Sequence, residues 1–239
     1  MRIPSTTPSP RTAALVSAAM ASAPSADASA ARRGARVVQL ASPDQFGVVY
    51  TPLRRPKGVM VSLPGTASHA MVAADRWIPH CKRHGLALVV LQWWDGAAGY
   101  LAPADIRDVA LKLLELCQAQ ELPRIVHGHS RGATQLYRIM GEPGGEHLAA
   151  DGYLVECGAW EEIWCPEPDA MGRRVVLVAG RGDAVAPPAA MLASAERLAQ
   201  LGAVIQVLQV GVGKPEDHGA LTREADSVDA AVAFLLGGA

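Results

Sequence analysis

A serine between two glycines is the residue in this sequence best suited to covalent chemistry. Ser130 lies in Gly128-His129-Ser130-Arg131-Gly132, after a β-type run at 125–127 and before an amphipathic segment at 133–140. A turn of this kind lifts a hydroxyl clear of a sheet edge, and flanking glycines remove β-carbons that would clash. The serine begins a helix, where N–H groups and the helix dipole favour developing negative charge. The pattern predicts a nucleophilic serine; a glycine-bounded turn with a capping serine is the alternative.

A serine hydroxyl becomes a nucleophile only with a base in hydrogen-bond reach and a carboxylate that orients this base. After a turn of this kind, the acid and then the histidine are expected behind later strands. Asp183 comes shortly after the apolar run 175–179. His218 comes shortly after the last apolar run, 204–210. The sequence therefore predicts a triad of Ser130, Asp183 and His218.

Three signatures in this order resemble those of the α/β-hydrolases of the esterase and lipase superfamily. They are Gly128-x-Ser130-x-Gly132, Gly180-x-x-Asp183-x-Val185-x-Pro187 and His218-Gly219. The resemblance extends from about Val37 to the C-terminus. It implies Ser130 as nucleophile, His218 as general base and then acid, and Asp183 as the orienting carboxylate. It also implies an acyl-enzyme intermediate and an α/β-hydrolase fold.

Other acidic and imidazole groups compete for these roles. Glu156 is the main rival for the acid, since some members of the superfamily place it after the preceding strand. We favour Asp183 because a Gly-x-x-Asp turn fits the exit of its strand. Asp217 adjoins the predicted base but cannot easily turn back to Nδ1, so we expect it to face solvent. We expect His127 to pack against the sheet and His129 to fill the turn.

An oxyanion hole needs two donors aimed at the tetrahedral oxygen. The first is expected to be the backbone N–H of Arg131, directly after the nucleophile. The second should come from the loop after the strand at 59–63, which reads Pro64-Gly65-Thr66-Ala67. The α/β-hydrolases usually have His-Gly here, and a backbone donor tolerates the departure. We favour the N–H of Thr66 and take Ala67 as second choice; an ordinary strand-to-helix turn is the alternative.

Four tryptophans fall in segments predicted at the C-terminal rim of the sheet, where open α/β sheets bind ligands. They are Trp93, Trp94, Trp160 and Trp164. They predict an apolar or aromatic acyl pocket, which Tyr100 joins, although bulky rim residues also simply cover a sheet edge. Residues 158–172 leave room for a short cap only, which suits soluble esters or a polymer surface. Cys157 and Cys165 bracket this cap, and the sequence leaves their bonding open.

Apolar runs and amphipathic patterns alternate along the chain. Strands are predicted at 36–40, 46–51, 58–63, 86–92, 125–127, 152–157, 175–179 and 204–210. Helices are predicted at 68–84, 103–120, 133–140, 187–201 and 227–236. This alternation predicts a mostly parallel central sheet with helices on both faces and a minimal cap, in one α/β domain over residues 36–239.

The composition suits one such domain and excludes several other classes. The 239 residues are 50% hydrophobic and 19% charged, with a formal net charge of −1, which argues against nucleic-acid binding. No apolar run reaches the roughly 18 residues of a membrane span. We find no C-x-x-C, no convincing ligand set and no phosphate loop, so neither a metal nor a cofactor is predicted. A monomer or small homo-oligomer is expected.

The first 35 residues differ from the rest. They are rich in alanine, serine, threonine and proline, with Arg2 and Arg11 before a modest apolar stretch and small residues after it. This pattern is typical of a secretory leader and predicts a secreted or periplasmic protein. A disordered tail on a cytoplasmic protein is the alternative, and the sequence does not settle whether the leader is cleaved.

These features predict a serine carboxylic-ester hydrolase that acts on a small, aromatic-acyl or polymeric ester. Peptidase, acyltransferase or perhydrolase chemistry on the same triad is an alternative. A non-catalytic binding protein of the same fold is another. The sequence does not choose the substrate.

Overall fold

The computed structural model describes residues 10, 13–15, 17–18, 29–40, 45–97, 99–141, 148, 150–163 and 165–237. Most of the predicted leader and Trp164 lie outside these residues. The chain divides into two compact units, Met1–Pro123 and Arg124–Ala239. The leader and the single domain over residues 36–239 stay predictions.

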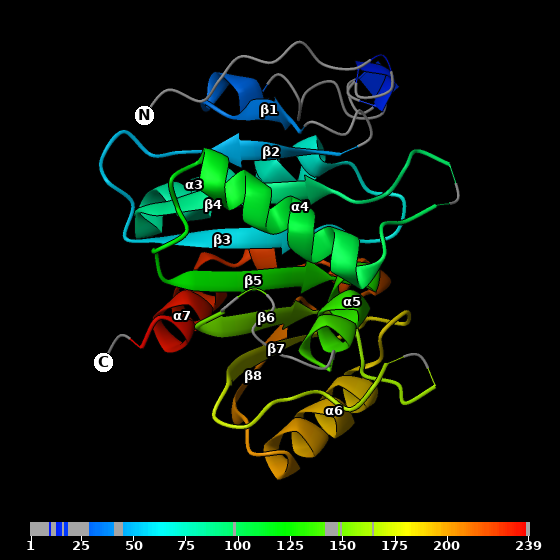
Figure 1. Cartoon of the computed structure of the whole chain (residues 1–239). Helices are drawn as coiled ribbons and strands as arrows, with labels where there is room; N and C mark the ends of the chain where they lie inside the picture. The colour runs from blue at the N-terminus through cyan, green and yellow to red at the C-terminus, as the bar shows by residue number, and fades with distance from the viewer. Residues whose placement is uncertain are drawn as a thin grey trace. The chain divides into compact units, whose positions relative to one another are not determined.

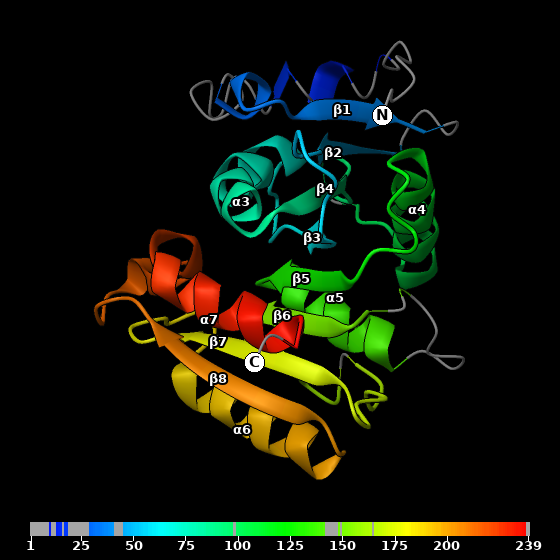
Figure 2. The same cartoon turned by 90° about the vertical axis from the view of Figure 1, so that its left-hand side faces the viewer.

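The first unit is built on a mixed sheet of strand order β1-β2-β4-β3. Its strands are β1 (Arg36–Gln39), β2 (Phe46–Tyr50), β3 (Gly58–Leu63) and β4 (Leu86–Gln92). β1 and β4 each pair with β2 in antiparallel fashion, whereas β3 and β4 are parallel. Helices α3 (Ala70–His84) and α4 (Pro103–Leu116) lie on opposite faces of this sheet (Figure 2). Every residue of β3 and β4 is buried, as their continuous apolar runs require.

The second unit contains four parallel strands in the order β5-β6-β7-β8. They are β5 (Arg124–His129), β6 (Gly152–Glu156), β7 (Arg174–Gly180) and β8 (Val204–Val210). The helices are α5 (Arg131–Met140), α6 (Pro188–Gln200) and α7 (Ala225–Leu235), with short 3₁₀ turns η1 (Pro215–Asp217) and η2 (Leu221–Arg223). Figures 1 and 2 show α6 and α7 on opposite faces of β7 and β8. Because the strands are parallel, the loops that follow them leave from the same edge.

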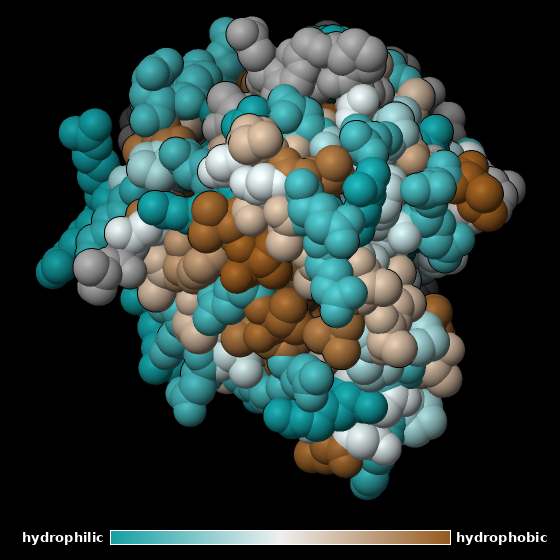
Figure 3. Space-filling model, turned by 90° about the horizontal axis from the view of Figure 1, so that it is seen from below, coloured by the Kyte–Doolittle hydropathy of each residue, from teal (hydrophilic) through white to brown (hydrophobic). Residues whose placement is uncertain are grey.

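Strand β8 is the last strand of this sheet and is only partly covered. Its residues are exposed or half-buried except Val210, and Val204 is 51% exposed. Figure 3 shows the molecule from below, and hydrophobic surface gathers near the middle of the side seen in that view. The buried end of β8, at Val210, is the end that leads into the loop carrying His218.

The structure confirms the predicted elements with small differences in length. The strand at 125–127 is longer, because pairing with β6 continues to His129 opposite Glu156. The helix predicted at 103–120 ends at Leu116, since Gln118 adopts a positive φ of 51° that an α-helix cannot contain. Among the described residues, no helix is both long and apolar enough to cross a membrane.

Candidate active site

Ser130 occupies a strained turn between β5 and α5. Its φ of 53° and ψ of −119° lie outside the usual regions for a residue with a side chain, which costs about 1–3 kcal/mol. Its N–H donates to the Glu156 carbonyl oxygen at 2.8 Å, which anchors the turn to β6. A Cβ at Gly128 would overlap the Gly132 carbonyl. The turn therefore requires glycine there, as the sequence pattern predicted.

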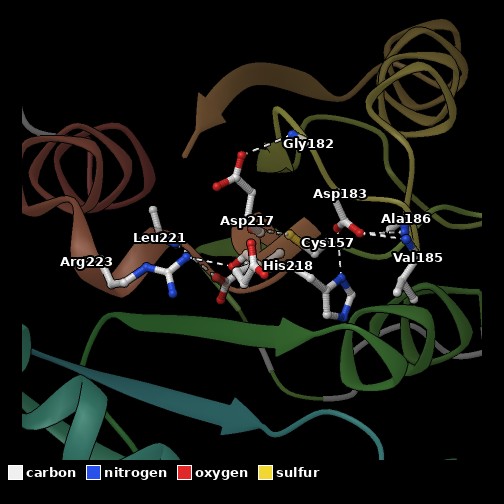
Figure 4. Close-up of polar contacts among 11 residues, drawn as sticks. Cys157, Gly182, Asp183, Val185, Ala186, Asp217, His218, Leu221 and Arg223 are labelled. Carbon is white, nitrogen blue, oxygen red and sulfur yellow. Dashed lines mark hydrogen bonds and ion pairs between the residues drawn. The ribbon is translucent and has the colours of Figure 1, made fainter. Parts of the chain in front are cut away.

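The side chains of His218 and Asp183 meet at the edge where β7 and β8 end. His218 Nδ1 lies 2.7 Å from Asp183 Oδ2 (Figure 4). Asp183 Oδ1 accepts the N–H groups of Val185 and Ala186 at 2.8 and 2.9 Å. Burial raises the pKa of the Asp183 carboxyl. The bonds from Ala186, His218 and Val185 outweigh burial, so this pKa falls below its ordinary 3.8.

The ionised Asp183 fixes the state of the imidazole. A carboxylate only accepts hydrogen bonds, so Nδ1 of His218 carries a proton, and in the neutral imidazole Nε2 is then the nitrogen with the lone pair. The Asp183 side chain is fully buried, whereas that of His218 is 20% exposed. The His218 ring lies 4.9 Å, centroid to centroid, from the ring of His129, the residue before Ser130. The predicted base, His218, is therefore oriented by Asp183 through Nδ1 and lies beside the serine turn.

Glu156, the rival acid, bonds to a different histidine. Its Oε2 lies 3.1 Å from His127 Nε2, and both side chains are almost fully buried. Its Oε1 accepts the N–H of Leu221 at 3.3 Å. Burial raises the pKa of the Glu156 carboxyl. The hydrogen bond from His127 and the nearby His129 together outweigh burial, so this pKa lies below its ordinary 4.5. His127 is buried as predicted, and Glu156 ties β5 to the segment just after His218.

Replacing Glu156 with alanine is expected to destabilise the fold by about 3–5 kcal/mol at pH 7, because it leaves His127 buried without its carboxylate. Glutamine keeps one acceptor oxygen, so Glu156→Gln should lose less. Since folding lowers the pKa of this carboxyl, its contribution is complete above pH 4.5 and disappears as pH falls through the lower folded value. Urea unfolding at pH 7 and at lower pH measures both effects. Equal stability of Glu156→Ala and wild type at pH 7 would contradict the prediction.

The expectation that Asp217 faces solvent is wrong. Asp217 is 2% exposed, and its carboxylate points inward to backbone N–H groups of its own loop and of Gly182 (Figure 4). The residue types indicate that Asp217 cannot easily reach its neighbour His218, but they carry no sign that a tight loop offers several N–H donors on the opposite side.

Cys157 follows β6 and lies unexpectedly close to the His218–Asp183 pair. One ligand atom from each of Cys157, Asp183 and His218 lies within 4.8 Å of the other two. Sulfur, carboxylate and imidazole are ligands that zinc accepts, but the Asp183–His218 bond uses two of these groups. Burial, and then the charge of Glu156, raise the pKa of the Cys157 thiol to about 12. This thiol therefore stays protonated at neutral pH and is a poor nucleophile.

The two cysteines that bracket the short cap are not bonded. All four cysteines are free and buried. Cys157 Sγ points to the Asp217 carbonyl oxygen at 3.9 Å, and Cys165 Sγ points to the Thr134 carbonyl oxygen at 3.5 Å. The cap is therefore held by packing and hydrogen bonds.

The two predicted oxyanion donors each come shortly after the end of a strand, Arg131 after β5 and Thr66 after β3. Arg131 is the first residue of α5, so its N–H belongs to the first turn, whose N–H groups lack intrahelical acceptors. In the first unit, Thr66 follows β3 and is exposed. The N–H of Ala67, the second choice, donates to the Tyr100 hydroxyl at 3.0 Å. This contact favours Thr66 over Ala67, and the role of Thr66 and Arg131 stays a prediction.

The described tryptophans differ in exposure. Trp93 is 2% exposed and donates from Nε1 to the Pro64 carbonyl oxygen at 2.9 Å, so it supports the loop that carries Thr66. Trp94 is half-buried, with Nε1 bonded to the Ala97 carbonyl oxygen. Trp160 is half-buried and lines a cavity of about 310 Å³ with residues of α6. Their contacts with a substrate stay predictions, and Trp164 lies outside the described residues.

No protein-family model matches the sequence, and no curated protein matches it either. Solved structures do match it. The esterase Est2 of Thermogutta terrifontis, bound to propionate, aligns with a TM-score of 0.62 at 16% identity, over 85% of this chain and 94% of the esterase. The Francisella virulence factor BioJ aligns with a TM-score of 0.67 at 14% identity, over 95% of both chains. LpqC, a poly(3-hydroxybutyrate) depolymerase from Bordetella parapertussis, aligns with a TM-score of 0.62 at 16% identity, over 89% of this chain and 93% of LpqC.

These likenesses cover most of each chain and agree with the mostly parallel strands and two-sided helices described above. The chain has the α/β-hydrolase fold. The fold class predicted from the sequence, and the resemblance that suggested it, are thereby confirmed. Identities this low show the fold alone, so the activity has to be argued from the residues of this chain.

The α/β-hydrolase fold carries little cap here. Between the end of β6 at Glu156 and the start of β7 at Arg174, the described residues contain no helix. The backbone of Gly158 lies close to the serine turn, since a Cβ there would come within 2.7 Å of the Ser130 carbonyl oxygen. This segment thus lines the turn without the multi-helix lid of an interfacially activated lipase.

Proposed function

We propose that this chain is a serine ester hydrolase with Ser130 as nucleophile, His218 as general base and Asp183 as orienting carboxylate. One observation carries the proposal. A His218 imidazole bonded at 2.7 Å to a buried carboxylate stands beside a strained serine turn, in a fold shared with esterases. A histidine held in this tautomer presents the free Nε2 lone pair that a serine hydroxyl needs.

The reaction proceeds through an acyl-enzyme. Ser130 Oγ attacks the ester carbonyl carbon while His218 Nε2 takes its proton, and Asp183 stabilises the resulting imidazolium. His218 then gives this proton to the leaving alcohol oxygen as the carbon–oxygen bond breaks. A water molecule, deprotonated by the same nitrogen, attacks the acyl-enzyme. His218 then returns this proton to Ser130 Oγ as the bond between Oγ and the acyl carbon breaks and the acid leaves. The N–H of Arg131, in the first turn of α5, holds the negative oxygen in both halves of the reaction.

The substrate we propose is a short-chain, aromatic-acyl or hydroxyacid-polymer ester. A short cap supports this choice, because the described residues between β6 and β7 contain no helix that could cover bulky alcohol groups or chain ends. Two proteins of similar fold act on, or bind, compounds of these classes. One is an esterase bound to propionate, and the other is a depolymerase of poly(3-hydroxybutyrate). No cofactor takes part in these steps.

Active-site labelling tests the proposal. A fluorophosphonate probe should label the native protein, and mass spectrometry should place the adduct on Ser130. Iodoacetamide should leave native Cys157 unmodified, because its thiol is buried and protonated. A panel of p-nitrophenyl acetate, butyrate and octanoate, methyl ferulate and poly(3-hydroxybutyrate) then ranks the substrates. No fluorophosphonate adduct, or an adduct on another residue, would refute Ser130 as the nucleophile.

A further inference from the structure

The predicted base and acid stand on separate loops whose relative placement has to be maintained. Asp183 lies in the loop after β7, which ends at Gly180, and His218 lies in the loop after β8, which ends at Val210. One hydrogen bond at 2.7 Å joins the two side chains directly. A single bond between groups on two irregular loops leaves the imidazole free to tilt unless the loops are also tied together.

The buried carboxylate of Asp217 supplies such a tie. Its Oδ1 accepts the N–H of Val212 at 3.1 Å, and its Oδ2 accepts those of Gly213 at 2.7 Å and Lys214 at 3.1 Å. These three bonds close the loop that carries His218. A fourth bond, from the N–H of Gly182 to Oδ2 at 3.0 Å, crosses to the other loop. Gly182 directly precedes Asp183, and Asp217 directly precedes His218. This bond therefore joins the two loops one residue before each member of the His218–Asp183 pair.

The two loops pack too closely for larger residues at the crossing. A Cβ at Gly182 would overlap the backbone nitrogen of Lys214. The backbone of one loop therefore lies directly against that of the other, and the Asp217 carboxylate sits at this contact. Figure 4 shows Asp217 and Gly182 on one side of Cys157 and the His218–Asp183 pair on the other.

The charge state of Asp217 suits this task. Burial raises the pKa of its carboxyl, but the N–H groups of Val212, Gly213, Lys214 and Gly182 lower it more, to below the ordinary 3.8. An ionised carboxylate only accepts, so all four N–H groups find an acceptor on two oxygens. An amide in its place would turn an NH₂ group toward some of these donors.

We propose that Asp217 is a positioning residue that locks the His218 loop to the Asp183 loop and so holds the imidazole against its carboxylate. Its effect on turnover rests on the proposed function, whereas its effect on the His218–Asp183 bond does not. Asp217 acts through these two residues, and its side chain is directed at backbone groups of the loops.

The test compares Asp217→Asn with Glu216→Gln. Glu216 is the exposed neighbour on the same 3₁₀ turn, so the control makes the same acid-to-amide change without these bonds. Asp217→Asn is expected to lower kcat for p-nitrophenyl butyrate about 100-fold with little change in KM, since misplacement by about 1 Å costs this much. Glu216→Gln should keep the wild-type kcat. Circular dichroism at the assay temperature verifies that both variants are folded.

Proton NMR monitors the hydrogen bond between His218 and Asp183 independently of catalytic activity. The Nδ1 proton of an imidazole bonded to a carboxylate resonates far downfield of the amide protons, and wild type and Glu216→Gln should show this signal. Asp217→Asn should lose or broaden it. Wild-type kcat with an unchanged signal in Asp217→Asn overturns the inference, as does a rise in KM alone. An inactive wild type refutes the proposed function and leaves this signal to decide the role of Asp217.

Amide exchange of the wild type covers the case in which Asp217→Asn does not fold. The N–H groups of Val212, Gly213, Lys214 and Gly182 should exchange slowly at neutral pH, although Val212, Gly213 and Lys214 are exposed loop residues. Fast exchange at all four positions overturns the inference regardless of any variant.

Discussion

Replacing Ser130 with alanine is expected to lower kcat for p-nitrophenyl butyrate about 10⁴- to 10⁶-fold. Alanine removes the Oγ that forms the acyl-enzyme and leaves only binding and oxyanion stabilisation. The fold should be retained, because alanine carries the same Cβ into the same positive φ of 53°. Initial rates of p-nitrophenol release, with a thermal melt of both proteins, measure the two effects.

Ser194→Ala is the matched control for this change. Ser194 belongs to the same unit and is buried, and its hydroxyl donates to the Ala190 carbonyl oxygen at 2.8 Å and accepts the N–H of Trp160 at 2.9 Å. Its removal should change stability modestly and leave kcat within about threefold of wild type. A Ser130→Ala protein that hydrolyses esters as fast as wild type would show that the observed activity does not use this hydroxyl.

The strands were predictable because most of them are buried on both faces. β4, with the sequence LALVVLQ, and β7, with RVVLVAG, are continuous apolar runs, which is what a covered parallel strand requires. Helix ends were less predictable. α4 stops at Leu116 because the backbone at Gln118 turns left-handed, and an apolar pattern that continues to residue 120 carries no sign of this.

The candidate triad was predictable because each member follows the end of a strand, so order and spacing indicate a shared edge. The surrounding buried groups were not. Glu156 ends its strand just as a superfamily acid can. The register between β5 and β6 places it opposite His129, and only the side-chain contact shows that it bonds His127. The partners of Asp217 are backbone N–H groups. Since nearly every residue has such a group, the amino-acid types do not predict these contacts. The closeness of Cys157 depends on three strand ends that converge in space.

Replacing Asp183 with asparagine is expected to lower kcat about 10⁴-fold while leaving KM and the fold nearly unchanged. The physical reason lies in the two backbone donors behind the carboxylate. The N–H groups of Val185 and Ala186 both point at Oδ1, so the amide oxygen of asparagine has to occupy that position. Its NH₂ group then faces His218 Nδ1 and donates to it. The imidazole is forced to carry its proton on Nε2, where it cannot accept the proton of Ser130.

Two further variants separate this effect from a general loss of acidic side chains. Asp151→Asn changes another carboxylate of the same unit that accepts a backbone N–H, from Arg124 at 2.7 Å, and should keep the wild-type kcat. Glu156→Gln changes the rival acid, which bonds His127, and should affect stability more than turnover. If Asp183→Asn instead keeps kcat within about tenfold and Glu156→Gln loses it, then Glu156 orients the catalytic histidine. The 2.7 Å bond between His218 and Asp183 would then be structural.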